Sequence, residues 1–291
     1  MTNSILFSPV GVEELNSYVQ KNISDNLYLF AYYNPKRYNS NLNNSTPELN
    51  FVMGILNLYS LYKDCCCFLV KGTKEDKDLL MILENYGYID KSEKKKIFEF
   101  ISIVTSFRML IAHNICNDSS NDVYYLCKVQ QFIEEKLGTC LVLSSYNDID
   151  LLPGEWNDLL KELRKQAEEI LEIFSIAFIK IHASPSPVLV IDEWKRVIIE
   201  SYKSESQLKK YLFTAMENDF KMYALINKKP YHPRCSSIVN KYYGTVKQKC
   251  IETMGDTSAL LNCQMKPFAF YGELLRKINI SKYWEEYYSL Y

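Results

Sequence analysis

Glycine and proline are scarce in this chain of 291 residues, which contains nine of each. Both residues are frequent in turns, so their scarcity disfavours an all-β fold with many tight turns. Long apolar runs are missing too, because the longest candidate, residues 170–181, contains Glu172 and Lys180. A helix that crosses a bilayer needs at least about 18 apolar residues, so the sequence predicts no membrane span.

The motifs of several enzyme classes are absent from the sequence. There is no Gly-x4-Gly-Lys-Ser/Thr phosphate loop, no Gly-x-Gly-x-x-Gly turn and no Gly-x-Ser-x-Gly nucleophile elbow. Paired Cys-x2-Cys ligands are also missing, so zinc would have to rely on the scattered set His232, Cys235, Cys250 and Cys263. We therefore expect no metal and no cofactor.

Charge and cysteine usage indicate the compartment. The net charge is −1, so the chain as a whole is not a polycation that would bind nucleic acid indiscriminately. The nine cysteines are odd in number and three are adjacent at 65–67, where small core side chains suit the pattern better than a metal site. The first residues lack the basic start and apolar run of a secretory signal. We expect reduced thiols and a cytoplasmic protein.

Apolar residues recur at helical spacing along most of the chain, which predicts an all-α or mostly α fold. Three segments stay open between strand and helix or extended chain: residues 27–33, 139–145 and 188–194. We expect helices at residues 12–21, 47–70, 73–87, 91–113, 123–137, 155–181, 194–202, 205–225, 235–254, 256–263 and 268–289.

Two loop segments divide the chain into three parts. Residues 34–48 are rich in Asn, Ser and Pro, and Pro185-Ser186-Pro187 breaks any helix. We expect an N-terminal extension over 1–48, a helical bundle over 49–184 and a helical, locally basic region over 185–291.

The most informative stretch is Arg-x4-His at the end of a long amphipathic helix, formed by Arg108 and His113. Arginine holds phosphate in a planar fork of donors, and histidine both takes and gives a proton near neutral pH. Five steps of about 100° place the two residues roughly 140° apart on a regular helix. They would converge if the last turn is loosened, or across two chains of a dimer.

A purely structural interpretation of the same pair stays open. Arg108 could form an ion pair with a carboxylate, and His113 could cap the helix C-terminus, where a cation is favoured.

Arg-x4-His at such a helix end, with the segment Ile111-Ala112-His113-Asn114, resembles the HEPN superfamily over about residues 50–180. The resemblance implies a helical bundle that forms a homodimer and a metal-independent ribonuclease site built from both chains. In that reading His113 acts on the ribose 2′-OH or the leaving oxygen, Arg108 stabilises charge on the scissile phosphate, and Asn114 orients either group. The family setting implies a toxin–antitoxin or antiviral defence role, with an antitoxin or regulatory protein as partner.

One residue departs from the family pattern. Many active members carry a polar residue directly after the arginine, and this chain has Met109. The alternative function is therefore a non-catalytic binding or scaffold protein whose HEPN-like bundle only mediates association.

Residues 201–250 contain ten basic residues against three acidic ones, and tyrosines stand among the lysines. Lysines attract phosphates and tyrosines stack on unpaired bases, so this region is a candidate RNA-binding surface. Acids elsewhere in space could instead balance it, and tyrosine is common throughout, with 23 residues. The candidate RNA-binding residues are Lys228, Lys229, Tyr231, Arg234 and Lys241.

Overall fold

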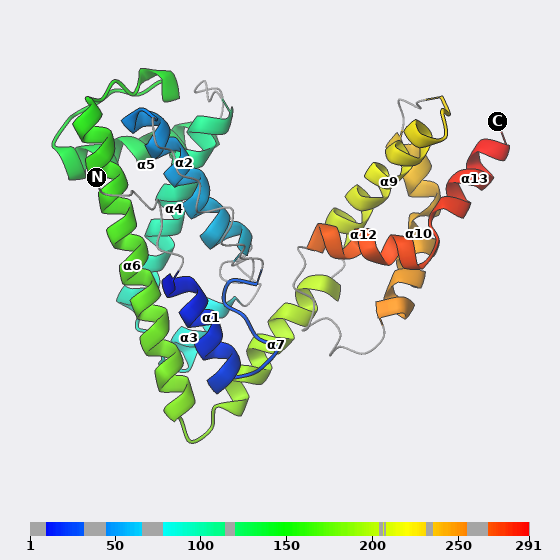
Figure 1. Ribbon diagram of the computed structural model, residues 1–291, viewed down its shortest axis with the longest axis horizontal. Helices are drawn as coiled ribbons and strands as arrows, with labels where there is room; N and C mark the ends of the chain where they lie inside the picture. The colour runs from blue at the N-terminus through cyan, green and yellow to red at the C-terminus, as the bar shows by residue number, and fades with distance from the viewer. Residues whose placement is uncertain are drawn as a thin grey trace. The chain divides into compact units, whose positions relative to one another are not determined.

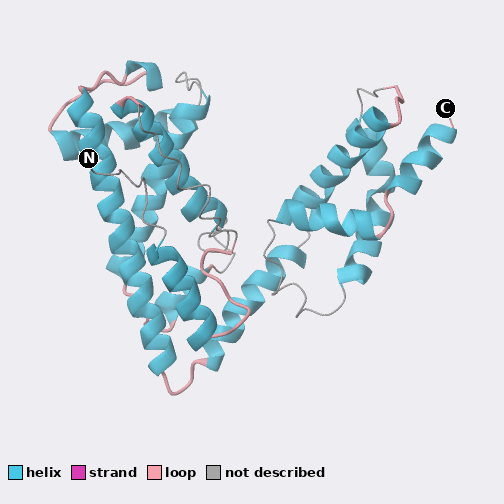
Figure 2. Cartoon of the chain, in the orientation of Figure 1, coloured by secondary structure: helices cyan, strands magenta, loops and turns pink. Residues whose placement is uncertain are grey.

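The computed structural model describes residues 10–31, 45–65, 78–113, 120–203, 206, 208–230, 235–254 and 267–290. Throughout these residues all regular structure is helical and no strand occurs, which confirms the predicted all-α fold (Figure 2). The chain divides into two compact units, Met1–Ile191 and Asp192–Tyr291. The division falls a few residues beyond the Pro185–Pro187 segment, inside helix α7 (Val188–Lys203).

The first unit is a helical bundle. In it α2 packs against α4 and α6, α5 packs against α4 and α6, α1 lies on α6, and α3 lies on α4 (Figure 1). Its elements are α1 (Val10–Asn22), α2 (Pro47–Tyr59), the π-helical segment η2 (Ser60–Cys65), α3 (Leu79–Asn85), α4 (Lys91–His113), α5 (Ser120–Leu137), the 3₁₀ turn η3 (Tyr146–Asp148) and α6 (Pro153–Ala183).

Local sequence signals define several of these helix ends. The Thr46 side chain accepts a hydrogen bond from the Leu49 amide, with Pro47 at the first helical position, so α2 starts as predicted. At the start of α4, Asp90 and Glu93 each accept a hydrogen bond from the other's backbone amide at 2.8 Å. Gly138 follows α5 with a φ of 70°, a conformation that favours glycine.

An aromatic cluster holds α2, α4, α5 and α6 together. The ring of Phe51 lies 5.0 Å from those of both Phe107 and Trp156, and Phe107 lies 5.9 Å from Phe132. Edge-to-face contacts of this kind add roughly 0.5–1.5 kcal/mol each beyond the area that they bury. About three turns further along α2–η2 and α6, the Tyr62 hydroxyl donates to the Ala167 carbonyl at 2.9 Å, which satisfies a buried polar group.

The second unit has a core of its own. Its elements beyond α7 are the π-helical segment η4 (Leu208–Leu212), α9 (Phe213–Ile226), α10 (Cys235–Met254), α12 (Pro267–Lys277) and α13 (Ser281–Ser289). The buried Trp284 ring lies 5.2 Å from Phe220 and 5.9 Å from Tyr242, and its indole N–H donates to Asp219 at 2.8 Å. Burial raises the pKa of the Asp219 carboxyl, opposed by this hydrogen bond.

The structure answers two questions that the sequence left open and corrects one predicted helix. Residues 188–194 are helical and belong to α7, whereas residues 139–143 form neither helix nor strand. The single helix expected over 268–289 is wrong, because α12 and α13 are separated by a turn at Asn279, whose φ is 53°. Asparagine tolerates this left-handed conformation better than most residues. The ends predicted near residues 70 and 73 and the helix at 256–263 lie outside the described residues.

No helix in the described ranges combines the length and the apolar character that crossing a bilayer requires.

Close packing of α2 on α6 predicts opposite effects for two Gly→Ala variants. A methyl group at Gly54 would lie 2.4 Å from Leu160 Cδ1, whereas one at Gly11 would meet Leu171 Cδ1 at an ordinary 3.6 Å. Each substitution gains up to about 1 kcal/mol of helix propensity, but overpacking at Gly54 costs about 1–3 kcal/mol. We expect denaturant titration to show Gly54→Ala as the less stable variant. Equal or greater stability of Gly54→Ala would contradict the close α2–α6 contact.

Candidate functional site

Burial of the core face fixes how the last turns of α4 are rotated. Phe107 and Leu110 are fully buried, so the intervening side chains of Arg108 and Met109 leave the core and are half-buried at its edge. The arginine that interrupts the apolar stripe in the sequence is therefore held at the rim of the bundle.

Arg108 lies against an aromatic face. Its guanidinium carbon is 5.1 Å from the centre of the Tyr59 ring, and Nη1 donates a weak hydrogen bond to the Met109 sulfur at 3.5 Å. Burial raises the pKa of the Tyr59 hydroxyl, while the positive charge of Arg108 opposes that rise. A guanidinium held against a ring is restricted in orientation, and its planar fork of donors matches an oxyanion.

The backbone of α4 remains α-helical through His113, so the expected loosening of the last turn does not occur between residues 108 and 113. Positions 108 and 113 consequently remain roughly 140° apart around the axis. The arc between them contains Phe98, Thr105 and Met109, which are exposed or half-buried. The buried Ile101 lies near its Arg108 edge, and the rest of the core face lies on the other side. Position 113 and Arg108 thus flank one accessible face of α4.

The remaining residues of the predicted catalytic set are only partly described. For His113 the structure describes the backbone, and Asn114 lies outside the described residues. The structure therefore defines the predicted site by the helix face between positions 108 and 113. Distances between the catalytic side chains lie outside what it describes.

A groove of about 150 Å³ opens on the same face of α4, one turn before Arg108. We name it the Lys63 groove; it is lined by Lys63 of η2, by Phe98, Ile101, Ser102 and Thr105 of α4, and by Tyr124 and Tyr125 of α5. Burial lowers the pKa of the Lys63 ammonium. Lys63 was not predicted as a site residue, although it is the first charged residue after Glu48 and is followed directly by Asp64.

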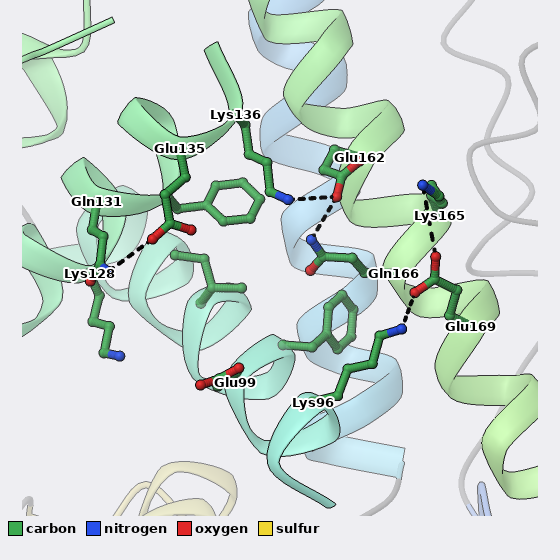
Figure 3. Close-up of a pocket in the computed structure, with 13 residues that line it drawn as sticks. Lys96, Glu99, Lys128, Gln131, Glu135, Lys136, Glu162, Lys165, Gln166 and Glu169 are labelled. Carbon is green, nitrogen blue, oxygen red and sulfur yellow. Dashed lines mark hydrogen bonds and ion pairs between the residues drawn. The ribbon is translucent and has the colours of Figure 1, made fainter. Parts of the chain in front are cut away.

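A second groove, of about 490 Å³, lies where α4, α5 and α6 meet, and its charges largely compensate one another (Figure 3). Glu162 receives the Lys136 ammonium at 3.0 Å and the Gln166 amide at 2.9 Å, and Lys96 and Lys165 both pair with Glu169 (Figure 3). These hydrogen bonds, from Gln166 first and then Lys136, lower the pKa of Glu162. The groove is best explained as a network of ion pairs that ties three helices together.

The candidate RNA-binding residues of the second unit are exposed where they are described. Lys228 and Lys229 follow the end of α9, and Lys229 Nζ lies 5.8 Å from the Tyr288 ring. Lys241 of α10 is exposed, with Nζ 5.4 Å from the Tyr242 ring. Tyr231 and Arg234 lie outside the described residues.

Two of the four possible zinc ligands lie in the described part of the chain. Cys235 and Cys250 are buried, and burial raises the pKa of the Cys250 thiol to about 12, which disfavours the thiolate that zinc requires. His232 and Cys263 lie outside the described residues, and elsewhere in the described chain no cluster of His, Cys, Asp or Glu suits a metal ion.

Comparison of the chain with protein-family models, curated proteins and solved structures gives no match. What the fold establishes is therefore the class alone, an all-α protein of two units.

The backbone at Lys228 predicts a stabilising substitution that also removes a charge from the candidate RNA surface. Its φ of 51° is left-handed, and Lys229 N donates to Ala224 O at 2.9 Å, as at many helix C-termini where glycine is preferred. We expect Lys228→Gly to raise the free energy of unfolding by up to about 1 kcal/mol.

The matched control is Lys229→Gly, which removes the same charge without relieving a positive φ. Thermal denaturation should therefore rank Lys228→Gly above Lys229→Gly, and the opposite order would contradict the left-handed assignment.

Proposed function

We propose that the protein is a metal-independent endoribonuclease of HEPN type that acts as a homodimer. The observation that carries the proposal is the placement of Arg108 and position 113 on either side of one accessible face at the end of α4. The all-helical bundle around α4 is the kind of fold that the resemblance implies.

In the proposed reaction the ribose 2′-hydroxyl loses a proton and attacks the adjacent phosphorus, and the 5′-oxygen of the next nucleotide leaves with a proton. His113 transfers one or both of these protons, and Arg108 stabilises the negative charge on the phosphoryl oxygens. Asn114 orients either group. The contact with the Tyr59 ring restricts the orientation of the guanidinium before the substrate binds.

A second chain completes the site in this proposal. Because α4 is unbroken at its end, a phosphate held by Arg108 is reached most directly by His113 of a twofold-related copy. The exposed lysines 228, 229 and 241, together with Tyr231 and Arg234, would engage the RNA beyond the cleavage point. The biological role would be that of a cytoplasmic toxin or antiviral effector restrained by an antitoxin or regulatory protein.

A second candidate is a non-catalytic helical binding or scaffold protein, and one observation favours it. The guanidinium of Arg108 is engaged by the ring of Tyr59 and the sulfur of Met109, where active relatives of the HEPN type carry a polar residue. Contacts of this kind would anchor an arginine structurally even after its chemistry had been lost.

Cleavage of single-stranded RNA in the presence of EDTA separates the two candidates. We expect wild-type protein to cleave, and both Arg108→Ala and His113→Ala to lose about 10²-fold or more in rate, as removal of an acid–base group or a charge-stabilising group does. Arg276→Ala and His182→Ala are the controls, since both residues are exposed and belong to helices other than α4. Equal cleavage by all variants, or none by the wild type, would defeat the enzyme proposal.

Mixing the two inactive variants tests whether the site is shared. In a dimer whose site combines Arg108 of one chain with His113 of the other, a mixed dimer of Arg108→Ala and His113→Ala retains one intact site. Statistical mixing should then restore about a quarter of wild-type activity. A site built within one chain would give no restoration, which would refute the two-chain arrangement.

A further inference from the structure

Lys63 is a half-buried cation that has no ion-pair partner among the residues that the structure describes. Within the described ranges its ammonium has no ion pair and no hydrogen bond, and its lowered pKa arises from burial alone. Removing an ammonium from water is costly unless an anion or a set of acceptors replaces the water.

Two other partly buried lysines of the same bundle have a carboxylate partner. Lys94, with 32% of its side chain exposed, pairs with Glu84, and Lys136, with 33% exposed, pairs with Glu162. The bundle thus places carboxylates beside its lysines at these positions but not at Lys63. An uncompensated cation at the wall of an open groove indicates an anionic ligand.

The walls of the Lys63 groove indicate what accompanies the anion. The rings of Tyr124 and Tyr125 lie 5.6 Å apart in an edge-to-face arrangement, and the Tyr124 hydroxyl lies 3.2 Å from Ser102 Oγ. Phe98 and Tyr124 are 54% and 48% exposed at the rim, where burial by a ligand would be favourable. Aromatic faces beside hydroxyl groups stack on a nucleobase and hydrogen-bond to its edge.

The volume and position of the Lys63 groove limit which ligands it can bind. A volume of 150 Å³ is smaller than the roughly 300 Å³ at which pockets for drug-sized molecules begin, so it accommodates one planar ring system. Tyr59 connects the groove to Arg108, because its ring lies under the guanidinium and its pKa, raised first by burial, also responds to Arg108, to Asp64 and to Tyr125 of the groove wall. The groove and the candidate cleavage site are neighbours.

We infer that the Lys63 groove binds a single nucleotide unit next to the scissile bond, with its phosphate on Lys63 and its unpaired base against Tyr124 and Tyr125. This inference deepens the proposed function and rests on it for the source of the nucleotide, which is single-stranded RNA. The groove would make the protein select unpaired RNA, since a paired base cannot turn into it.

Binding is tested with a single-stranded 2′-O-methyl oligonucleotide, which cannot undergo attack by its 2′-oxygen, so that affinity is read without cleavage. We expect Lys63→Met to weaken binding about tenfold or more and to reduce the salt dependence by close to one phosphate contact. Tyr125→Leu should weaken binding by a similar factor without changing the salt slope, because stacking releases no counterion. Lys63→Arg should retain most of the affinity.

Lys95→Met is the matched control, since Lys95 is an exposed lysine of the same bundle with 74% of its side chain accessible. It should change affinity by less than about twofold, as a rim charge does. Equal losses for Lys63→Met and Lys95→Met would overturn the inference. Thermal denaturation without ligand provides a second readout, because removal of an uncompensated charge should leave the melting temperature of Lys63→Met unchanged or higher. A large decrease would show Lys63 to be structural and would also overturn it.

A second binding experiment uses a free 5′-mononucleotide. If it binds as tightly as the oligonucleotide and loses affinity in Lys63→Met, the groove belongs to a free nucleotide and its place in RNA recognition is refuted. Cleavage activity keeps the two proposals apart. If the wild-type protein binds RNA through Lys63 but does not cleave it, the proposed ribonuclease activity is refuted and the binding role of the groove stands. If it cleaves RNA and Lys63→Met cleaves equally well, the binding role is refuted and the ribonuclease activity stands.

Discussion

The rotation of α4 about its own axis is the constraint on which the candidate site depends. Phe107 contacts aromatic rings from α2 and α5, and Leu110 is buried one turn further on. A close-packed core tolerates little rotation, because turning the helix would expose these side chains and open cavities. The core thereby sets the direction of Arg108, and with it which face of the helix remains accessible.

Compensation of charge distinguishes the two grooves of the bundle. Around Glu162 and Glu169 the ammonium groups of Lys96, Lys136 and Lys165 pair with carboxylates, so these charges contribute to holding α4, α5 and α6 in register. The Lys63 groove itself is lined by rings, hydroxyls and one aliphatic side chain, with no carboxylate among its lining residues. Of these two grooves the one at Glu162 is larger, but the uncompensated charge of Lys63 favours the smaller one as the binding site.

Most helices could be predicted from the sequence, because apolar spacing and capping residues are local signals. Residues 235–254 form α10 as expected, and the Thr46-Pro47 start of α2 is correct. The break at Asn279 depends on a left-handed residue that asparagine permits without requiring, so composition gave no reason to expect it. Arg108 is visible in the sequence as a charge in an apolar stripe, whereas the grouping of Lys63 with Tyr125 depends on how α2, α4 and α5 pack and could not be predicted locally.

The accessible face of α4 also limits how two copies could meet. Residues 98–105, which line the Lys63 groove, occupy about 10 Å of helix length, and residues 108–113 occupy about 8 Å beyond them. A twofold contact spread over the whole face would cover the groove and exclude any nucleotide from it. If a phosphate is shared between Arg108 of one chain and His113 of the other, the contact between chains must therefore be confined to the last turns of α4. RNA would then enter along the earlier turns, past the exposed ring of Phe98.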